Sequence, residues 1–325
     1  MQNNVGTPQE SQTDPHRRLK EFLLTYSFAI VFALLIAYLA YSTPKFLTVS
    51  NIINVFRQVS NQGIIAVGMT MVLIMGQIDL SVGAIVAFAA VLNALLLKSG
   101  IPIPAAIAVT LAVSCMWGGL NGFITAHFRL HAFLVTMATM TLIRGMTYTL
   151  TGGYPVGGLP QDFFIYGSGQ LGFIPFPIIY MGIVFAVGAF VLSSTSFGRS
   201  VYAIGGNEDA ARLSGINVER VKIGVFIASA LVSAVAGLVL SSRLMAGSPE
   251  IGIGWELDIV AAVIIGGTKI LGGEGKLTGT LLGVLFIGVL TNGMILLDIT
   301  PYMQQVVRGL VILGAVILNS LQEKR

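Results

Sequence analysis

The chain has 325 residues, of which 55% are hydrophobic and only 10% are charged. Soluble domains carry about 25% charged residues, so this composition excludes a water-soluble globule. The net charge of +4 is best explained by orientation in a membrane and not by nucleic-acid binding, and the single Cys115 excludes an internal disulfide framework.

The first 21 residues are polar and end in HRRLK, which predicts a short cytoplasmic tail. The apolar run FLLTYSFAIVFALLIAYLA follows at 22–40. A cleaved signal peptide is the alternative, but the run is too long for one and no small-residue cleavage site follows it. We therefore expect this run to be the first of a series of membrane-spanning helices.

Hydropathy and the breaks at Gly, Pro and charged residues predict an all-α, polytopic membrane protein with about ten transmembrane helices. The membrane domain spans residues 22–321, and 322–325 form a second cytoplasmic end. The eighth helix is short for a full crossing, so we expect it to be tilted or broken. The predicted helices are 22–42, 51–75, 80–97, 103–126, 132–151, 177–194, 222–245, 257–270, 277–297 and 302–320.

The distribution of Lys and Arg indicates the orientation of these helices. With the N-terminus inside, twelve of them fall in cytoplasmic segments, whereas only Lys45 and Lys98 fall in outer loops. This positive-inside bias supports an even number of spans, with both termini cytoplasmic. The connection 152–176 has seven glycines and no Lys or Arg, so we expect it outside, and the charged connection 195–221 is predicted inside.

The sequence GGNEDAARLSG within the connection 195–221 predicts a short helix. Asn207 suits the N-cap, Glu208 and Asp209 suit the positive N-terminal end, and Gly215 suits the C-terminal stop. Two helical turns are not stable alone, so this helix needs the membrane surface or a partner protein to pack against. The alternative is a solvated connector with a little helical structure.

Three blocks resemble the permease subunits of ribose-type sugar ABC importers. GRSVYAIGGNEDAARLSGI resembles the cytoplasmic loop of that family, and GQIDLSVG at 76–83 is similar to its GGIDLSVG. ELDIVAAVIIGGTKILGGEGKLTGTLLG at 256–283 follows its late Gly-rich block. The resemblance covers nearly all of the chain after the tail. Gln77 replaces a glycine of the family pattern, and Lys269 and Glu274 are charges added in a Gly-rich turn.

The resemblance implies a type II importer fold, like that of the vitamin B12 permeases, in the bacterial inner membrane. The implied partners are a second permease copy in a homodimer, a periplasmic sugar-binding protein and a cytoplasmic ABC ATPase that binds ATP and Mg²⁺. The short cytoplasmic helix would then be a coupling helix that docks in a cleft of the ATPase, with Ala210 and Ala211 as its small-residue face. Its residues are Asn207, Glu208, Asp209, Ala210, Ala211, Arg212, Leu213, Ser214 and Gly215.

No motif predicts that this chain is an enzyme or holds a cofactor. GGEGKLTG at 272–279 lacks two parts of a phosphate-binding loop, because Ile270 stands at its first glycine and Leu277 at its hydroxyl position. A tight turn between the eighth and ninth helices is the better interpretation. His127 and His131 have a spacing known from metal sites, but no third ligand is evident. The Gly pairs in GGLNG (118–122) and GTLLG (279–283) predict close helix packing.

A polar stripe occupies the second predicted helix. Asn54, Gln58, Asn61 and Gln62 share one helical face, and lipid cannot satisfy their amides. The stripe therefore faces protein or water. Either it forms hydrogen bonds that hold the bundle together, or it lines a translocation path and offers weak polar contacts to sugar hydroxyls.

Four arginines fall in the outer halves of predicted helices: Arg57, Arg144, Arg243 and Arg308. Snorkelling of the long side chain toward the outer interface is one explanation, and it suffices for Arg243. The resemblance suggests a sharper hypothesis, in which Arg57, Arg144 and Arg308 form an electropositive outer mouth that receives acidic residues of the binding protein.

Asp79 lies in apolar surroundings at a helix boundary, where an unpaired carboxylate is costly. Capping of the third helix, with help from Ser81, is favoured over proton coupling. A proton-coupled secondary transporter that uses Asp79 is the alternative function for the whole chain, but it gives the connection 195–221 no role.

Overall fold

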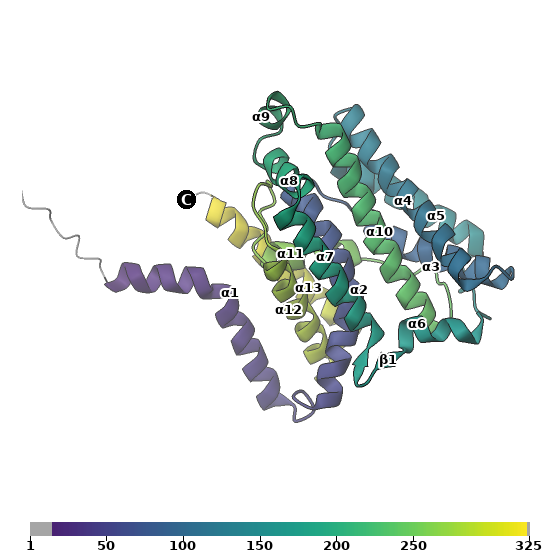
Figure 1. Cartoon of the computed structure of the whole chain (residues 1–325). Coiled ribbons are helices and arrows are strands. Elements are labelled where there is room, and N and C mark those ends of the chain that lie inside the picture. Colours follow the sequence, from purple (N-terminus) through teal and green to yellow (C-terminus); the bar gives the residue numbers. More distant parts are fainter. Residues whose placement is uncertain (1–14, 324–325) are drawn as a thin grey trace, which may run out of the picture.

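The computed structural model describes the backbone of residues 15–323 and, within it, the side chains of residues 28–314, 316 and 317. Helices dominate the described chain and form one bundle (Figure 1). They are α1 (Pro15–Ser42), α2 (Val49–Ile74), α3 (Val82–Lys98), α4 (Ile103–His127), α5 (Ala132–Thr151), η1 (Gln161–Phe163), α6 (Phe164–Ser168), α7 (Phe176–Ser194), α8 (Ser196–Gly206), α9 (Glu208–Leu213), α10 (Val218–Leu244), α11 (Trp255–Ile265), α12 (Leu277–Leu296) and α13 (Pro301–Glu323).

Each of the ten predicted segments coincides with one long or medium helix of the described chain, and most ends agree within a few residues. The first helix starts earlier than predicted, at Pro15, while residues 1–14 of the predicted tail and 324–325 of the predicted end lie outside the described residues. The prediction missed α6, α8 and a two-stranded hairpin of β1 (Gln170–Leu171) and β2 (Ile174–Pro175), which is a small exception to the all-α class.

Length and hydropathy together distinguish some of these helices from the others. Within the described residues, α4, α7, α10 and α12 are long and apolar enough to cross a membrane by length and composition alone. α3 and residues 28–42 of α1 are apolar but shorter. The chain is therefore a helical membrane protein.

The helix α11 is the short eighth segment that the sequence predicts. Its 11 residues extend only about 16 Å at 1.5 Å per residue, roughly half of a bilayer core. It ends at Gly266, and the Gly-rich loop 266–276 then leads into α12. Because α11 stops within the bundle, the backbone N–H and C=O groups of this loop need hydrogen-bond partners from the protein.

The helix α10 lies at the centre of the bundle, packed on α2, α3 and α4 (Figure 1). A Cβ atom at Gly118 of α4 would overlap the carbonyl oxygen of Phe226, and one at Gly122 would crowd the backbone of Ile223. The pair predicted in GGLNG therefore permits close contact between α4 and α10. The pair Gly279 and Gly283 does the same for α12 against the end of α11.

Three backbone segments meet at the end of α2. The amide of Gly273, in the loop 266–276, donates to the carbonyl of Ile74 at 2.8 Å. Gly205 of α8 approaches the same carbonyl so closely that a Cβ atom would overlap it. Gly272 and Gly273 have φ of +88° and +80°, which glycine adopts without strain. The predicted tight glycine turn is thus confirmed. It brings the backbone segments of α2, α8 and the loop before α12 into contact.

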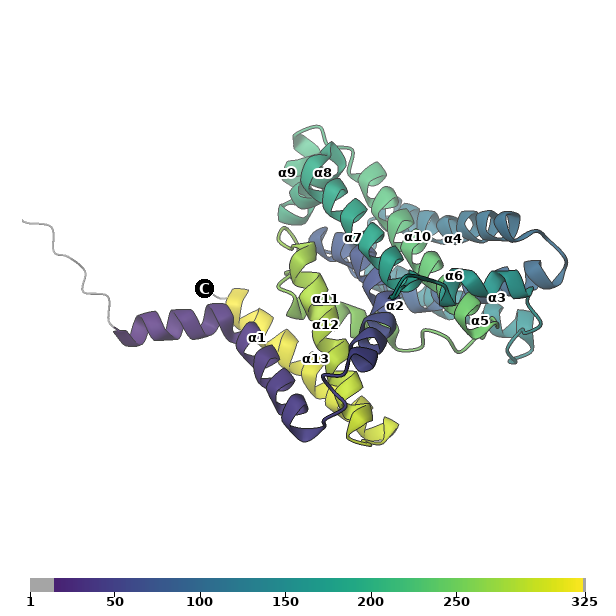
Figure 2. The same ribbon diagram turned by 60° about the horizontal axis from the view of Figure 1, so that its bottom comes forward.

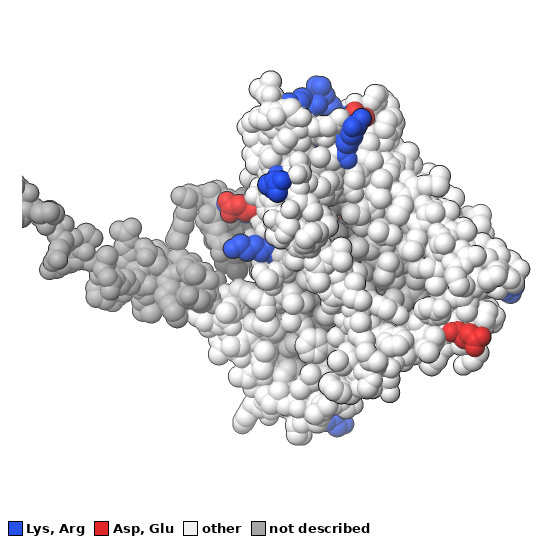
Figure 3. Space-filling model, viewed as in Figure 1, with Lys and Arg blue, Asp and Glu red and all other residues white. Residues whose placement is uncertain are grey.

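The two ends of the bundle differ in what they carry. α8 and α9 lie together at one end in both ribbon views (Figures 1 and 2), and in Figure 1 the hairpin and the turn between α1 and α2 lie toward the opposite end. In the space-filling view, Lys and Arg gather over the α8–α9 end, and most of the flank between the ends carries no charge (Figure 3). This arrangement agrees with an apolar band between two polar ends.

Candidate functional site

The short helix predicted in the charged connection is α9, with the caps that the sequence indicates. The side chain of Asn207 accepts a hydrogen bond from the amide of Ala210 at 2.9 Å, which satisfies one of the free amides at the helix start. Gly215 has a φ of +86° just after the helix. The local prediction for this segment is confirmed in detail.

A buried cation holds α9 to α10. The Nζ atom of Lys222 lies 2.7 Å from Oε2 of Glu208, and only 6% of the Lys222 side chain is exposed. The other oxygen of Glu208 pairs with Arg212 at 3.0 Å within α9. The carboxylate of Glu208 therefore forms one ion pair within α9 and a second one with α10.

The outward face of α9 differs from the expected small-residue face. Ala211 is buried against Val218, Ile204 and their neighbours, so only Ala210 of the two alanines points outward. Asp209 and Leu213 are also exposed, and Leu213 is 90% exposed. The expected pair of alanines is thus wrong for Ala211, because the helix uses it to pack on its own bundle.

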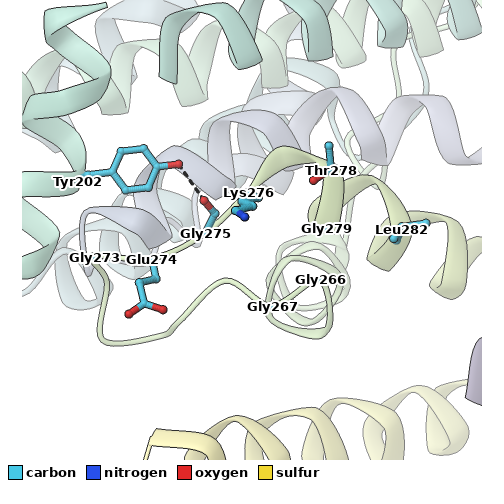
Figure 4. Close-up of a pocket in the computed structure, with 10 residues that line it drawn as sticks. All are labelled: Tyr202, Gly266, Gly267, Gly273, Glu274, Gly275, Lys276, Thr278, Gly279 and Leu282. Atoms are coloured by element: carbon cyan, nitrogen blue, oxygen red, sulfur yellow. Dashed lines mark hydrogen bonds between the residues drawn. The ribbon is translucent and has the colours of Figure 1, made fainter. Parts of the chain in front are cut away.

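A hollow of about 560 Å³ opens between α8 and the start of α12 (Figure 4). Its lining is mainly glycine backbone, together with Tyr202, Glu274, Lys276, Thr278 and Leu282. The hydroxyl of Tyr202 donates to the carbonyl of Gly275 at 2.8 Å and so ties α8 to the loop 266–276. The hollow therefore lies where α8 packs against the Gly-rich loop 266–276.

The polar stripe of α2 is divided by the fold. Asn54 and Gln58 are exposed and Gln62 is partly buried, whereas Asn61 is 2% exposed. The Oδ1 atom of Asn61 has no hydrogen-bond partner within the described chain. Three of the four amides thus reach the surface of this chain, and Asn61 lies inside the bundle. Their role as a path remains a prediction.

Arg57 and Asn54 share a hollow of about 590 Å³ near the start of α2, beside the hairpin residues Gln170, Gly172 and Phe173. Within the described chain, Arg57 makes no ion pair and no hydrogen bond. Arg243, in the last turn of α10, is close enough to be repelled by the charge of Arg57. The hollow is consequently positive and lacks an acidic partner from its own surroundings.

The two other arginines of the predicted outer mouth make internal contacts. Arg144 donates from Nη1 to the carbonyls of Pro249 and Ile251, at 2.6 and 2.9 Å, and holds the loop before α11. Arg308 of α13 pairs with the buried Asp258 of α11 at 3.2 Å. The structure therefore does not bring the three arginines together as free groups, and only Arg57 is available in this chain.

Asp79 lies in the turn between α2 and α3 and is completely buried. Its Oδ1 atom accepts from the amide and the hydroxyl of Ser81, and its Oδ2 atom accepts from the hydroxyl of Ser229 in α10 at 2.8 Å. Ser81 is the residue at the N-cap position of α3, but its side chain caps no amide; the amide of Ser81 is instead satisfied by Asp79. The predicted structural role of Asp79 at the start of α3, with help from Ser81, is thus confirmed, and Asp79 also ties the turn to α10.

Several polar residues of the interior escaped the sequence analysis. Asn121 of α4 donates to the hydroxyl of Ser81 at 2.9 Å and extends the Asp79 cluster. Asn51 and Asn292 exchange two amide hydrogen bonds of 3.0 Å between α2 and α12. The polar residues at 110, 114, 121 and 125 share one face of α4. This spacing alone predicts that Asn121 faces the interior of the bundle.

The sequence matches known transport proteins over most of its length. A family described as "Branched-chain amino acid transport system / permease component" matches residues 51–316. The chain is 43% identical over 307 residues to the ribose import permease protein RbsC of Haemophilus influenzae, covering 93% of this chain and 95% of that protein.

Two further relatives show how far the similarity extends. RbsC of Bacillus subtilis is 44% identical over 305 residues, or 93% of this chain and 92% of that protein. The L-arabinose transport system permease protein AraH of Escherichia coli K12 is 38% identical over 299 residues, or 92% and 91%. No solved structure matches the chain.

Proposed function

The chain belongs to the family of permease components described for branched-chain amino acid transport, and from this membership we propose that it is the membrane subunit of an ATP-driven importer of a monosaccharide. Its relatives named for ribose and L-arabinose import support a sugar as the substrate class. They also favour this function over a proton-coupled transporter centred on Asp79.

In the proposed importer, the helices that match the ten predicted segments cross the bacterial inner membrane in a type II arrangement, with both termini in the cytoplasm. The positive-inside distribution of Lys and Arg supports this orientation. The end that carries α8 and α9 then faces the cytoplasm, and the hairpin end faces the periplasm.

The observation that carries the proposal is the geometry of α9. It is a capped helix at the basic end, held to the bundle by Lys222 and Ala211, with Asp209, Ala210 and Leu213 outward. A large apolar side chain that is 90% exposed at a polar end suits a contact with another protein. We assign this surface to the ATPase subunit, which binds the ATP and Mg²⁺ that drive transport.

The exposed amides of α2 support a second copy of the chain. Asn54 and Gln58 point away from their own bundle, and amides facing lipid would each cost on the order of a few kcal/mol. In a homodimer, this stripe would face an aqueous path between the two copies. Arg57 would contribute to the outer surface that receives the periplasmic binding protein.

The test is uptake of radiolabelled ribose and L-arabinose by cells that lack this chain and carry its ATPase and binding protein. Wild-type chain should restore uptake of at least one sugar. Replacement of 207–215 by a Gly/Ser linker of equal length should abolish uptake and co-purification of the ATPase, with the chain still in the membrane. Normal uptake by the linker variant would refute the role of α9.

A single-residue version of this test compares two exposed leucines at opposite ends. Leu213→Ala should weaken ATPase binding, because it removes the apolar side chain presented by α9. Leu171→Ala in the hairpin, where the leucine is 70% exposed, is the matched control and should leave ATPase binding unchanged. Equal effects of both substitutions would contradict the assignment of the docking face.

A further inference from the structure

We propose that Lys222 is the positioning residue that makes α9 and α10 move as one body, so that a displacement of α9 is carried by α10 to the Asp79 turn. The proposal deepens the proposed function and rests on it, because it assumes that α9 is the contact with the ATPase. It assigns a mechanical role to a side chain that the partner does not touch.

The orientation of α9 relative to α10 has to be fixed by a side-chain contact, which we call the lock. Only residues 214–217 separate its end from the start of α10, and Gly215 in this link has a φ of +86°. A link of four residues that contains glycine lets a helix pivot. The single residue Asn207 joins α9 to α8, but within α9 only Ala211 is buried, and one small side chain does not fix the orientation of α9 relative to α10.

The ion pair of Lys222 and Glu208 supplies that lock. The two groups are 14 residues apart in sequence and 2.7 Å apart in space. A lysine that is 6% exposed is strongly destabilising without its partner, so the pair resists separation far better than a surface salt bridge does. Any pivot of α9 away from α10 would separate the Lys222 ammonium group from its carboxylate partner.

The second step is the link from α10 to the interior. Ser229 lies seven residues after Lys222, which places it on the same face of α10 and about 10 Å further along the axis. Its hydroxyl donates to Asp79 at 2.8 Å. One face of α10 therefore carries the contact with α9 at one end and the contact with the α2–α3 turn deeper in the bundle.

The third step is that close packing makes this part of α10 rigid. Gly118 and Gly122 of α4 allow backbone contact with α10 between these two points, and Gly68 of α2 meets the backbone of Ser229. Densely packed helices respond to a push by shifting as units. Displacement of α9 should therefore reach both neighbouring helices and the turn of Asp79.

The experiment uses the complete transporter in lipid nanodiscs, with the ATPase subunit and the binding protein present. The variants are Lys222→Met, which removes the charge but retains much of the apolar stem, and the exchange Glu208→Lys with Lys222→Glu. Arg220→Met is the matched control, since it removes one positive charge from an exposed position at the same end of α10. The measurements are ATPase binding, ATP hydrolysis and sugar transported per ATP.

Lys222→Met should bind the ATPase within about twofold of wild type, yet transport roughly tenfold less sugar per ATP, a size typical of coupling between sites. The charge exchange should recover most of the lost transport, and Arg220→Met should behave as wild type. A merely stabilising pair would lower the amount of folded transporter but would leave the sugar transported per ATP unchanged.

The proposal is overturned if Lys222→Met keeps the wild-type ratio of sugar to ATP, or if the charge exchange recovers nothing. Where Lys222→Met does not assemble, the exchange variant decides: recovered assembly and transport support the lock, and failure of both refutes it. Failure of the proposed function is distinguishable, because the linker variant of 207–215 would then still bind the ATPase.

Discussion

The two ends of the molecule use charged residues in opposite ways. At the α9 end, Glu208 pairs with groups that are close in sequence: Arg212 is four residues away and Lys222 is 14 residues away. At the hairpin end, Arg144 and Arg308 reach groups 105 and 50 residues away, and Arg57 has no partner within the described chain. Local charges at one end hold the short helix α9 together and to α10, whereas distant contacts at the other end hold α11 and its preceding loop in place.

The internal contacts of Arg144 and Arg308 at the hairpin end should contribute measurably to stability. The largest effect is expected for Arg308→Met, which leaves Asp258 buried and uncompensated, at a cost of about 3 kcal/mol in the free energy of unfolding. Thermal unfolding in detergent should show a clear loss. The double variant with Asp258→Asn should recover most of it, and no recovery would contradict the pairing.

Arg144→Met should have the next largest effect. It removes two charge-assisted hydrogen bonds to the loop before α11, with a loss of about 2 kcal/mol. Limited proteolysis should cut the loop 245–254 faster in the variant than in wild type. An unchanged cleavage rate would show that the loop is held by other contacts.

The α9 end should respond to smaller changes. Asn207→Ala removes the N-cap and should cost α9 about 1 kcal/mol, enough to unwind two turns in part. Hydrogen exchange of the α9 amides should accelerate and uptake should fall. Asn217→Ala, which removes the cap of the long α10, is the control and should leave exchange in α9 unchanged.

The smallest effect on stability is expected for Arg57→Glu, within about 0.5 kcal/mol, because this side chain has no partner in its own chain. Its effect should appear instead as weaker binding of the periplasmic protein and lower uptake. Lys45→Glu gives the same change of charge at the same end, outside the hollow, and should have less effect. Unchanged uptake with Arg57→Glu would contradict the proposal that Arg57 belongs to the surface that receives the periplasmic binding protein.

The positions of the long helices were predictable because their signals are local. Runs of apolar residues set the length of each helix, and Gly, Pro and charges set the breaks, so even the short α11 was expected. The short elements α6 and α8 and the hairpin were missed, since their stability comes from packing on other segments. The hairpin strands, for example, have only two residues each.

The sequence by itself determined the class of protein, the course of the helices and the caps of α9, since composition, periodicity and capping act over a few neighbouring residues. Only the tertiary structure decided which polar groups meet: Asp79 with Ser229, Lys222 with Glu208, and Arg308 with Asp258. In an apolar bundle a buried charge must find a partner, and the fold alone decides which distant helix supplies it.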